Sequence, residues 1–248
     1  MRRLKSIDRA FDIVHLLWRL DGATPTTVAD HLDVSVSTAH DYLQSLAATG
    51  YVTNDEGEYA LGYAFLAMGS RLQRRNRLFH VARPELRELA DDTGELANVG
   101  IAEGDDWVLL HNEVGSRGLE LGDYPGLRTA FHTHAAGKVV LAHFPEERRD
   151  ELLAGDLEAV TAETTTDPDA LREELATIRE EGVAIDRDGQ VVGIGVVAAP
   201  LLADEEILGS LAVVCPSGRL ADEADRERLR RTVREAADTV MINYRYSG

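Results

Sequence analysis

Hydroxyl and amide side chains gather on one side of a helical repeat in the stretch VSVSTAHDYLQSL, residues 34–46. At about 100° per residue, the face opposite the apolar stripe centres on Asp41. Serine, threonine and glutamine there can donate and accept hydrogen bonds, as base edges in the DNA major groove require. A merely solvated face would look the same in isolation, so the flanking elements decide between the two interpretations. The apolar stripe comprises Val36, Ala39, Leu43 and Leu46.

The elements around this stretch have the order of a winged helix-turn-helix domain. Apolar residues at helical spacing predict a first helix at about 8–20. Thr24 can cap a second helix that starts at Pro25, and Ser35 can cap the third, so a tight turn joins these two helices. Two short strands within residues 51–61 then predict a hairpin, the wing.

The predicted winged domain spans residues 1–62, and a linker helix with a basic end follows at 63–78. DNA contacts are expected from the N-terminal arm, the start of the second helix, the third helix and the wing turn. The expected DNA-binding residues are Arg2, Arg3, Lys5, Thr26, Ser35, Ser37, Thr38, His40, Asp41, Gln44, Ser45 and Asn54.

Charge is divided unevenly along the 248 residues. Lys plus Arg number 26 against 44 Asp plus Glu, which gives a net charge of -18. Residues 1–78 carry nine of each sign, so the whole excess of acid lies in residues 79–248. A segment that approaches a polyanion such as DNA cannot carry a large excess of acid, because uncompensated carboxylates near phosphates oppose binding. With only Lys5 and Lys138 as lysines, this acidic composition also indicates a halophilic archaeal source.

The sequence indicates a protein of a reducing compartment, without a signal peptide or a membrane-spanning segment. The single cysteine, Cys215, allows no internal disulfide. MRRLK resembles the start of a signal peptide, but Asp12, His15 and Arg19 interrupt the apolar run that follows. No stretch is long and apolar enough to span a membrane. We therefore expect a cytoplasmic protein.

Residues 79–248 alternate helices and strands, which predicts an α+β domain with mostly antiparallel pairing. Turns at 104–105 and 204–206 join neighbouring strands as hairpins. Helices are predicted at 84–93, 135–142, 168–181 and 222–244, and strands at 97–102, 107–111, 183–186, 194–202 and 207–214.

Two glycine-containing motifs in this domain could suggest nucleotide chemistry. GIGVVA, residues 193–198, fits a dinucleotide fingerprint, but Pro200 and further β-prone sequence follow in place of a helix. AAGK, residues 135–138, resembles the end of a phosphate-binding loop, but Val139 replaces the hydroxyl that binds magnesium. As a helix start, this segment can still hold an anionic ligand on its free N–H groups.

The other reactive side chains show no recognisable catalytic arrangement in the sequence. His132 and His134 alternate as on a strand, without a further ligand cluster for zinc. Cys215, between Val214 and Pro216, is more typical of a small core residue than of a nucleophile. We expect no enzyme activity, no catalytic residues, no metal and no cofactor.

Blocks of sequence along nearly the whole chain resemble the IclR family of transcription regulators. SIDRAFDIVHLL, VADHLDVSVSTAHDYLQSLAATGYV and EYALG are similar to that family's DNA-binding domain. RPELRELADDTGELANVGIAEGDDWVLLH, HTHAAGKVVLA, EEGVAIDRDGQVVGIGVVAAPLL and GSLAVVCPSGRL follow in the order of its second domain. The chain departs from the pattern at Val36 and Asp41, where members commonly carry basic residues, which implies a different operator sequence.

The resemblance implies a GAF-like C-terminal domain, residues 79–248, that binds a small effector. By this resemblance, four segments form the pocket. They are the residues just before the Gly137-Lys138 pair, the acid before the glycine-rich strand at 194–202, that strand itself, and the following strand at 207–214. Members that bind small carboxylates have serines at the last two positions, where this chain has Ala212 and Val214. A sugar-derived or aromatic acid is therefore favoured over a small 2-oxo acid. The implied effector-binding residues are Ala135, Ala136, Asp186, Ile194, Val196, Ala212 and Val214.

The sequence thus predicts a transcription regulator, as a homodimer or dimer of dimers, that binds double-stranded operator DNA and controls catabolic genes. Effector binding would change the relative placement of two DNA-binding heads. Two alternatives stay open. One is an architectural DNA binder without an effector, and the other is a GAF-like catalytic or second-messenger domain fused to a DNA-binding remnant.

Overall fold

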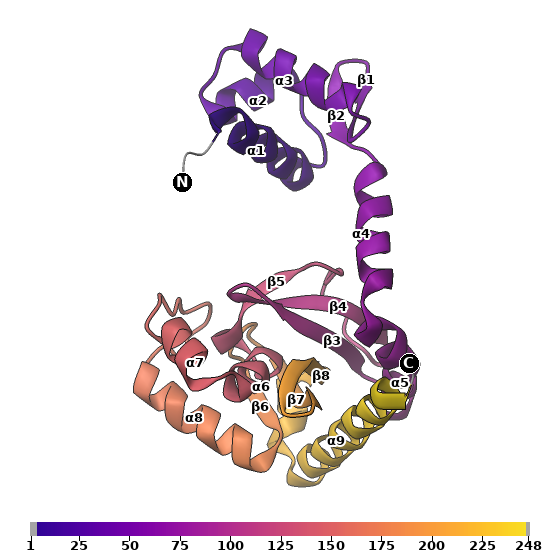
Figure 1. Ribbon diagram of the computed structural model, residues 1–248, viewed down its shortest axis with the longest axis vertical. Helices are drawn as coiled ribbons and strands as arrows, with labels where there is room; N and C mark the ends of the chain where they lie inside the picture. The colour runs from indigo at the N-terminus through magenta and orange to yellow at the C-terminus, as the bar shows by residue number, and fades with distance from the viewer. Residues whose placement is uncertain (1–3, 247–248) are drawn as a thin grey trace. The chain divides into compact units, whose positions relative to one another are not determined.

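The computed structural model describes residues 4–246 of the protein, which divide after Arg75 into two compact units. Figure 1 shows a helical unit with one hairpin and a larger unit built on a single sheet. Each unit has an apolar core of its own. The predicted fold class, a winged helix-turn-helix followed by a linker helix and an α+β domain, is confirmed.

The N-terminal unit packs three helices against a two-stranded wing. Ile13, Leu16 and Leu17 of the first helix are buried together with Val28 and Leu43 from the next two. These apolar positions recur at helical spacing, which explains why each helix buries one face only. The elements are α1 (Lys5–Leu20), α2 (Pro25–Leu32), α3 (Val36–Ala48), β1 (Val52–Asp55), β2 (Glu58–Leu61) and α4 (Ala64–Arg75).

Side-chain caps set where α2 and α3 begin, as the sequence predicted. The Thr24 hydroxyl accepts the N–H of Thr27 at 3.3 Å, and the Ser35 hydroxyl accepts that of Thr38 at 3.1 Å. Between the helices, Asp33 adopts a left-handed conformation with φ 49°, which makes the turn tight. The caps therefore fix where each of the two helices begins.

The predicted apolar stripe of α3 is wrong at its first position. Val36 is 49% exposed, whereas Ala39 and Leu43 are fully buried. Val36 occupies the first turn of α3, ahead of the turns that contact the core. The buried stripe therefore starts at Ala39, and Val36 joins the surface of the helix.

The predicted linker helix at 63–78 is also divided by the structure. It consists of α4, which ends at Arg75, and the start of α5 (Arg77–Thr93). Asn76 has extended backbone angles, and its side chain accepts the N–H of Leu78 at 2.9 Å, so it caps a new helix.

The predicted start of the next helix at Pro84 is consequently wrong, because Pro84 lies inside α5. Proline at that position removes one backbone hydrogen bond of the helix. The burial of Ala82, Leu86 and Leu89 against the sheet offsets that loss.

The C-terminal unit is built on one antiparallel sheet with the strand order β5-β4-β3-β8-β7-β6. The helices α5 and α9 (Glu223–Tyr246) pack on one face. On the other face lies α6 (Ala135–His143), against which α8 (Pro168–Glu181) packs. The strands are β3 (Leu96–Glu103), β4 (Asp106–Val114), β5 (Arg128–Ala130), β6 (Ala184–Arg187), β7 (Ile194–Ala203) and β8 (Glu206–Pro216).

Because both faces of the sheet are covered, its central strands are apolar on both sides. In β8, Leu211, Val213 and Cys215 face α5 and α9, while Ala212 and Val214 face α6. This explains the nearly continuous apolar sequence of β7 and β8. The short strand β5 and α7 (Glu146–Leu153) were not predicted from the sequence, because they carry few apolar residues at a regular period.

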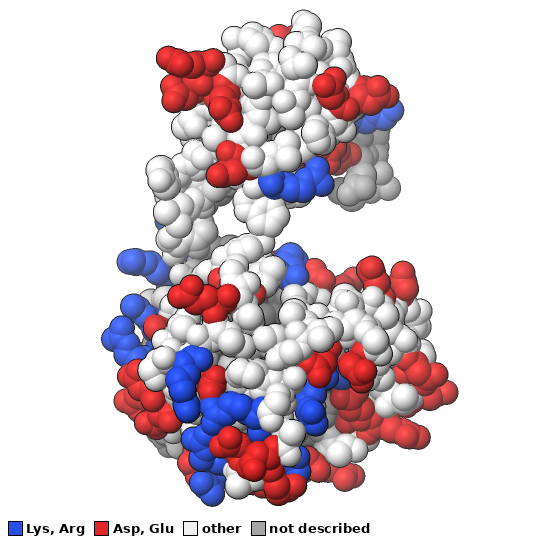
Figure 2. All heavy atoms as spheres, turned by 180° about the vertical axis from the view of Figure 1, so that it is seen from behind, with Lys and Arg blue, Asp and Glu red and all other residues white. Residues whose placement is uncertain are grey.

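Figure 2 shows acidic and basic side chains interspersed on one face of the molecule. In the C-terminal unit, Arg230 pairs with Glu181 at 3.0 Å and Arg219 pairs with the buried Glu95. None of the helices in residues 4–246 is long and apolar enough to cross a lipid bilayer.

Candidate DNA-binding and effector-binding sites

The polar face predicted for α3 is exposed. Ser37, Asp41 and Gln44 project from the side of the helix opposite the buried Ala39 and Leu43. This exposure leaves the middle of α3 accessible to a partner surface. Of the other predicted DNA-binding residues, Lys5, Thr26, Ser35, His40, Ser45 and Asn54 are exposed and Thr38 is half-buried, while Arg2 and Arg3 lie outside the described residues.

Some of these side chains already make hydrogen bonds inside the unit. Ser45 donates its hydroxyl proton to the carbonyl oxygen of Asp41 at 2.7 Å. Asn54 accepts the N–H of Gly57 at 3.0 Å and so orders the turn of the wing. Ser35 is committed to capping α3. Ser45 keeps acceptor lone pairs and Asn54 keeps its amide NH₂. The Ser35 and Thr38 hydroxyls share a hydrogen bond of 2.8 Å in which either oxygen can donate, so Ser35 keeps a proton for a partner when Thr38 is the donor.

The predicted effector-binding residues lie together in the C-terminal unit. Ala135 and Ala136 form the first turn of α6, and Val196, Ala212 and Val214 belong to the same buried cluster. Ile194 packs at the margin of that cluster. Asp186 reaches the same side of the sheet from β6, because it faces Lys138 of α6.

His134 caps the first turn of α6 and does not continue a strand, as the alternation with His132 had suggested. His132 lies in a short 3₁₀ turn, Phe131–Thr133, which reverses the chain before α6. The His134 Nδ1 accepts the N–H of Gly137 at 3.3 Å, so that nitrogen carries no proton. Its Nε2 therefore donates to the Thr129 hydroxyl at 2.8 Å.

Burial lowers the pKa of His134 to about 3, and the positive charge of Lys138 and the ring of His132 add to the effect. The edge of the His134 ring also meets the indole of Trp107, with centroids 5.0 Å apart. This histidine is thus held neutral at the start of α6, in a position where it orders the helix.

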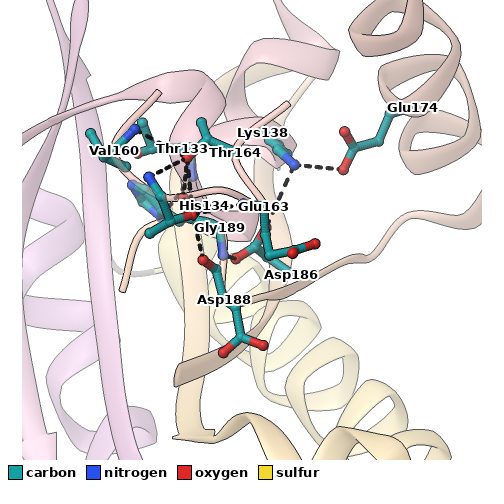
Figure 3. A network of polar contacts seen from close by, with 12 residues as sticks. Thr133, His134, Lys138, Val160, Glu163, Thr164, Glu174, Asp186, Asp188 and Gly189 are labelled. Carbon is teal, nitrogen blue, oxygen red and sulfur yellow. Dashed lines mark hydrogen bonds and ion pairs between the residues drawn. The ribbon is translucent and has the colours of Figure 1, made fainter. Parts of the chain in front are cut away.

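Lys138 of α6 is a buried cation with two carboxylate neighbours. Its Nζ donates to Glu174 of α8 at 2.7 Å and lies 3.6 Å from Asp186 (Figure 3). Burial raises the pKa of Asp186, which Lys138 lowers only in part. Neither Lys138 nor the neutral His134 therefore supplies an uncompensated positive charge to an anionic effector.

Asp186 also organises the loop that follows β6. Its Oδ2 accepts the N–H of Gly189 at 3.1 Å, and a Cβ at Gly189 would lie 2.4 Å from Oδ1. Two hydroxyls hold the same loop from the other side: Thr161 donates to Asp188 O at 2.7 Å and Thr164 to Gly189 O at 2.6 Å. Asp186 therefore orders the turn at Gly189, whether or not it also contacts an effector.

GIGVVA and Cys215, which could suggest other chemistry, are parts of the folded sheet. GIGVVA runs into β7, which pairs with β8 along its length and with β6 over residues 195–198. Burial raises the pKa of the Cys215 thiol to about 11, with a contribution from Glu95, so this thiol stays protonated inside the core. Within residues 4–246, no group of three histidine, cysteine, aspartate or glutamate side chains could hold a metal ion.

The sequence did not predict the ion pair of Lys138 with Glu174 or the capping role of His134. Lys138 carried a signal, because it is one of two lysines in the chain. Glu174 carried none, since its role depends on the packing of α8 against α6.

Known proteins share this order of an N-terminal helix-turn-helix domain and a C-terminal α+β domain. Residues 6–56 match the IclR helix-turn-helix domain, and residues 70–242 match the C-terminal domain of bacterial IclR transcriptional regulators. The regulator BhcR of Paracoccus denitrificans is 38% identical over 88% of this chain and 80% of its own length. The probable regulator ArcR of Halobacterium salinarum is 30% identical over 97% of this chain and 94% of its own.

Solved structures share the fold. An IclR homologue from Microbacterium hydrocarbonoxydans, complexed with 4-hydroxybenzoate, has a TM-score of 0.81 and covers 97% of this chain and 99% of its own. At 23% identity, this likeness concerns the fold alone. The two family matches together span most of the described residues. The chain therefore belongs to the IclR family of transcription regulators, DNA-binding proteins with a C-terminal effector domain rather than enzymes.

Proposed function

We propose that this regulator controls catabolic genes by sensing a small carboxylic acid, sugar-derived or aromatic, in its C-terminal unit. One observation carries the proposal. Residues far apart in the sequence, from Ala135 to Val214, meet on the α6 side of the sheet next to the first turn of α6. The N–H groups of Ala135 and Ala136 begin that turn and have no partner within the helix, so they favour a carboxylate, while the apolar cluster favours a carbon skeleton.

Operator recognition is assigned to α3 and its neighbours in the N-terminal unit. Ser37, Asp41 and Gln44 are the proposed base-reading residues, because they are exposed at the centre of α3. Lys5, Thr26 and Ser35 are proposed to contact phosphates from the ends of the helices. The neutral balance of residues 1–78 supports approach to DNA by this unit rather than by the acidic one.

The effector is proposed to be larger than a 2-oxo acid. Ala212 and Val214 offer no hydroxyl to a second polar group, so they favour an apolar or extended ligand. The structural relative from Microbacterium hydrocarbonoxydans is complexed with 4-hydroxybenzoate, so the shared fold can accommodate an aromatic acid.

We propose that two copies of the chain associate through the N-terminal unit, as a homodimer or as part of a dimer of dimers. A groove of about 710 Å³ lies between α1 and α4, lined by Phe11, Tyr51, Met68 and Leu72 among others. The helix α4 buries none of its residues, and Leu72 is 70% exposed. An amphipathic helix with an uncovered apolar side is typical of a protomer contact.

Leu72→Glu should therefore shift the protein towards monomer in sedimentation experiments, because it places a charge in the groove. Ser70→Glu is the matched control, since Ser70 projects from nearly the opposite side of α4. If Leu72→Glu assembles like wild type, α4 does not form the contact between protomers.

The proposed function is tested by first selecting an operator from randomised DNA and then titrating the complex with a panel of acids. The panel contains sugar acids, aromatic acids and 2-oxo acids. We expect at least one sugar-derived or aromatic acid to change operator affinity. A response to 2-oxo acids alone would overturn the effector class. The absence of any response would favour an architectural DNA binder, and turnover of a panel member would favour a catalytic domain.

We further propose that the protein works at high salt in the cytoplasm, where its operator DNA lies. The net charge of -18, with two lysines among 26 basic residues, supports this proposal. So does the similarity to the regulator from Halobacterium salinarum. Unfolding stability should rise between low and molar potassium chloride, because salt screens the repulsion among carboxylates. A fall in stability would contradict a halophilic origin.

A further inference from the structure

Asn98 is a buried amide on the sheet face that α6 covers. It lies in β3 and is 7% exposed, and no described residue donates a hydrogen bond to its buried Oδ1. Its neighbours Ala97 and Val99 face α5 and α9, so Asn98 points to the other side of the sheet. In the register of the strands, Asn98 lies opposite Ala212, one of the proposed effector-binding residues.

The polar groups around Asn98 have other partners or cannot donate. The indole N–H of Trp107, which lies over Gly100 two residues along β3, donates to the Ser210 hydroxyl at 2.9 Å. Ala212 has no polar side-chain atom. Asn112, the register partner of Asn98 in β4, does not donate to the Oδ1.

An unpaired buried carbonyl oxygen is costly, and an apolar side chain of the same shape would remove that cost. The other unpaired buried oxygen found in residues 4–246, Oε2 of Glu95, has a different explanation. Glu95 is held through its Oε1 by Arg219, so its burial serves an ion pair. Asn98 forms no ion pair, and its acceptor is therefore available to a ligand.

We propose that Asn98 is a specificity-determining residue of the effector site, where its Oδ1 accepts a hydrogen bond from a hydroxyl group of the effector. This rests on the proposed function, in which the carboxylate of the effector meets the first turn of α6. The effector is then a hydroxylated carboxylic acid. Its deoxy counterpart would leave the Asn98 oxygen unpaired and would bind more weakly.

The first experiment needs no effector. Thermal unfolding of full-length protein is compared for wild type and Asn98→Leu. If the Oδ1 is unpaired in the free protein, Asn98→Leu should melt at the same temperature or higher. A melting temperature several degrees lower would show that Asn98 has a structural hydrogen bond, and would overturn the proposal. Asn243→Leu is the control. It removes an amide of α9, on the other face of the sheet, that donates a hydrogen bond to Glu85.

The second experiment uses calorimetric titration with matched pairs of acids: 4-hydroxybenzoate and benzoate, glycerate and propanoate, gluconate and hexanoate. For wild type, we expect the hydroxylated member of at least one pair to bind about tenfold or more tightly than its partner. The benzoate pair, which differs by a single hydroxyl, measures the contribution of one hydrogen bond. In Asn98→Leu this preference should disappear, while Asn243→Leu should retain it.

The outcomes separate this proposal from the proposed function. Binding of acids without a preference for the hydroxylated members would overturn the role of Asn98 and leave acid sensing intact. A preference that survives in Asn98→Leu would do the same. Failure of wild type to bind any of the acids would count against acid sensing itself, and the role of Asn98 would fall with it.

Discussion

His134 holds the start of α6 as a neutral ring, and this makes the C-terminal unit sensitive to acid. The pKa of His134 is about 3 in the folded chain against an ordinary value of 6.5. The unfolded chain therefore binds more protons between these values, and the stabilisation present above pH 6.5 is lost as the pH falls towards 3.

We predict that His134→Asn, which keeps a capping acceptor but cannot titrate, reduces the loss of unfolding free energy between pH 7 and pH 4.5 by about 2–3 kcal/mol. Urea unfolding at the two pH values measures this, with the exposed His15→Asn as control. The raised pKa of Asp186 acts in the opposite sense, and it is common to both proteins. Parallel pH dependence of wild type and His134→Asn would contradict the prediction.

Asp186 accepts the N–H of Gly189 and faces Lys138, so its side chain orders the loop after β6. We expect Asp186→Ala to lower the free energy of unfolding by about 1–3 kcal/mol, because a buried donor and a buried cation each lose a partner. Asp186→Asn, which keeps an oxygen for Gly189, should lose less. Calorimetric titration of the folded mutant with a responding acid then shows whether Asp186 also contacts the effector. An unchanged melting temperature would contradict the loop role.

Asp41 is an exposed carboxylate at the centre of the proposed recognition face of α3. It is repulsive near phosphates but can accept a hydrogen bond from a cytosine amine. We predict that Asp41→Ala raises non-specific DNA affinity and relaxes the choice at one base pair by about 1–3 kcal/mol. Selection from randomised DNA measures both, with Asp12→Ala on α1 as control. Unchanged discrimination would show that Asp41 is only solvated.

At the scale of elements, the cap of α3 has two roles that substitution can separate. The Ser35 hydroxyl accepts the N–H of Thr38 and is also proposed to lie near a phosphate. Ser35→Ala should cost about 1 kcal/mol of stability by removing the cap. Ser35→Asp keeps the cap and adds a negative charge, so it should retain stability and lose operator affinity. If Ser35→Asp binds DNA like wild type, Ser35 does not approach phosphate.

For the whole molecule, the division of charge predicts weakly salt-dependent DNA binding. Residues 1–78 carry no net charge, and residues 79–248 carry all of the excess acid. We expect the full chain and the segment 1–78 to show a slope of only a few in log affinity against log salt concentration, because few phosphates are neutralised. Salt titration of operator binding measures the slope. A slope as steep as that of strongly basic repressors would contradict this view.

The sequence by itself determined the order of the amphipathic helices and the long strands, although not β5 and α7, and it determined most of their bounds. The helix at 168–181 and the caps at Thr24 and Ser35 agree with the structure, because caps and hydrophobic periodicity are local properties. The grouping of the effector-binding residues came from the family resemblance, and their role there stays a prediction.

Only the tertiary structure decided which polar groups meet and which stay unpaired. Pro84 lies inside α5 because its neighbours bury against the sheet, and His134 stays neutral because the folded chain buries its ring. Lys138 meets Glu174 and Asp186 through the packing of α6 against α8 and β6. The unpaired oxygen of Asn98 likewise depends on strands distant in the sequence. Such contacts cannot be read from local periodicity, since burial and hydrogen bonding depend on the folded neighbours of each residue.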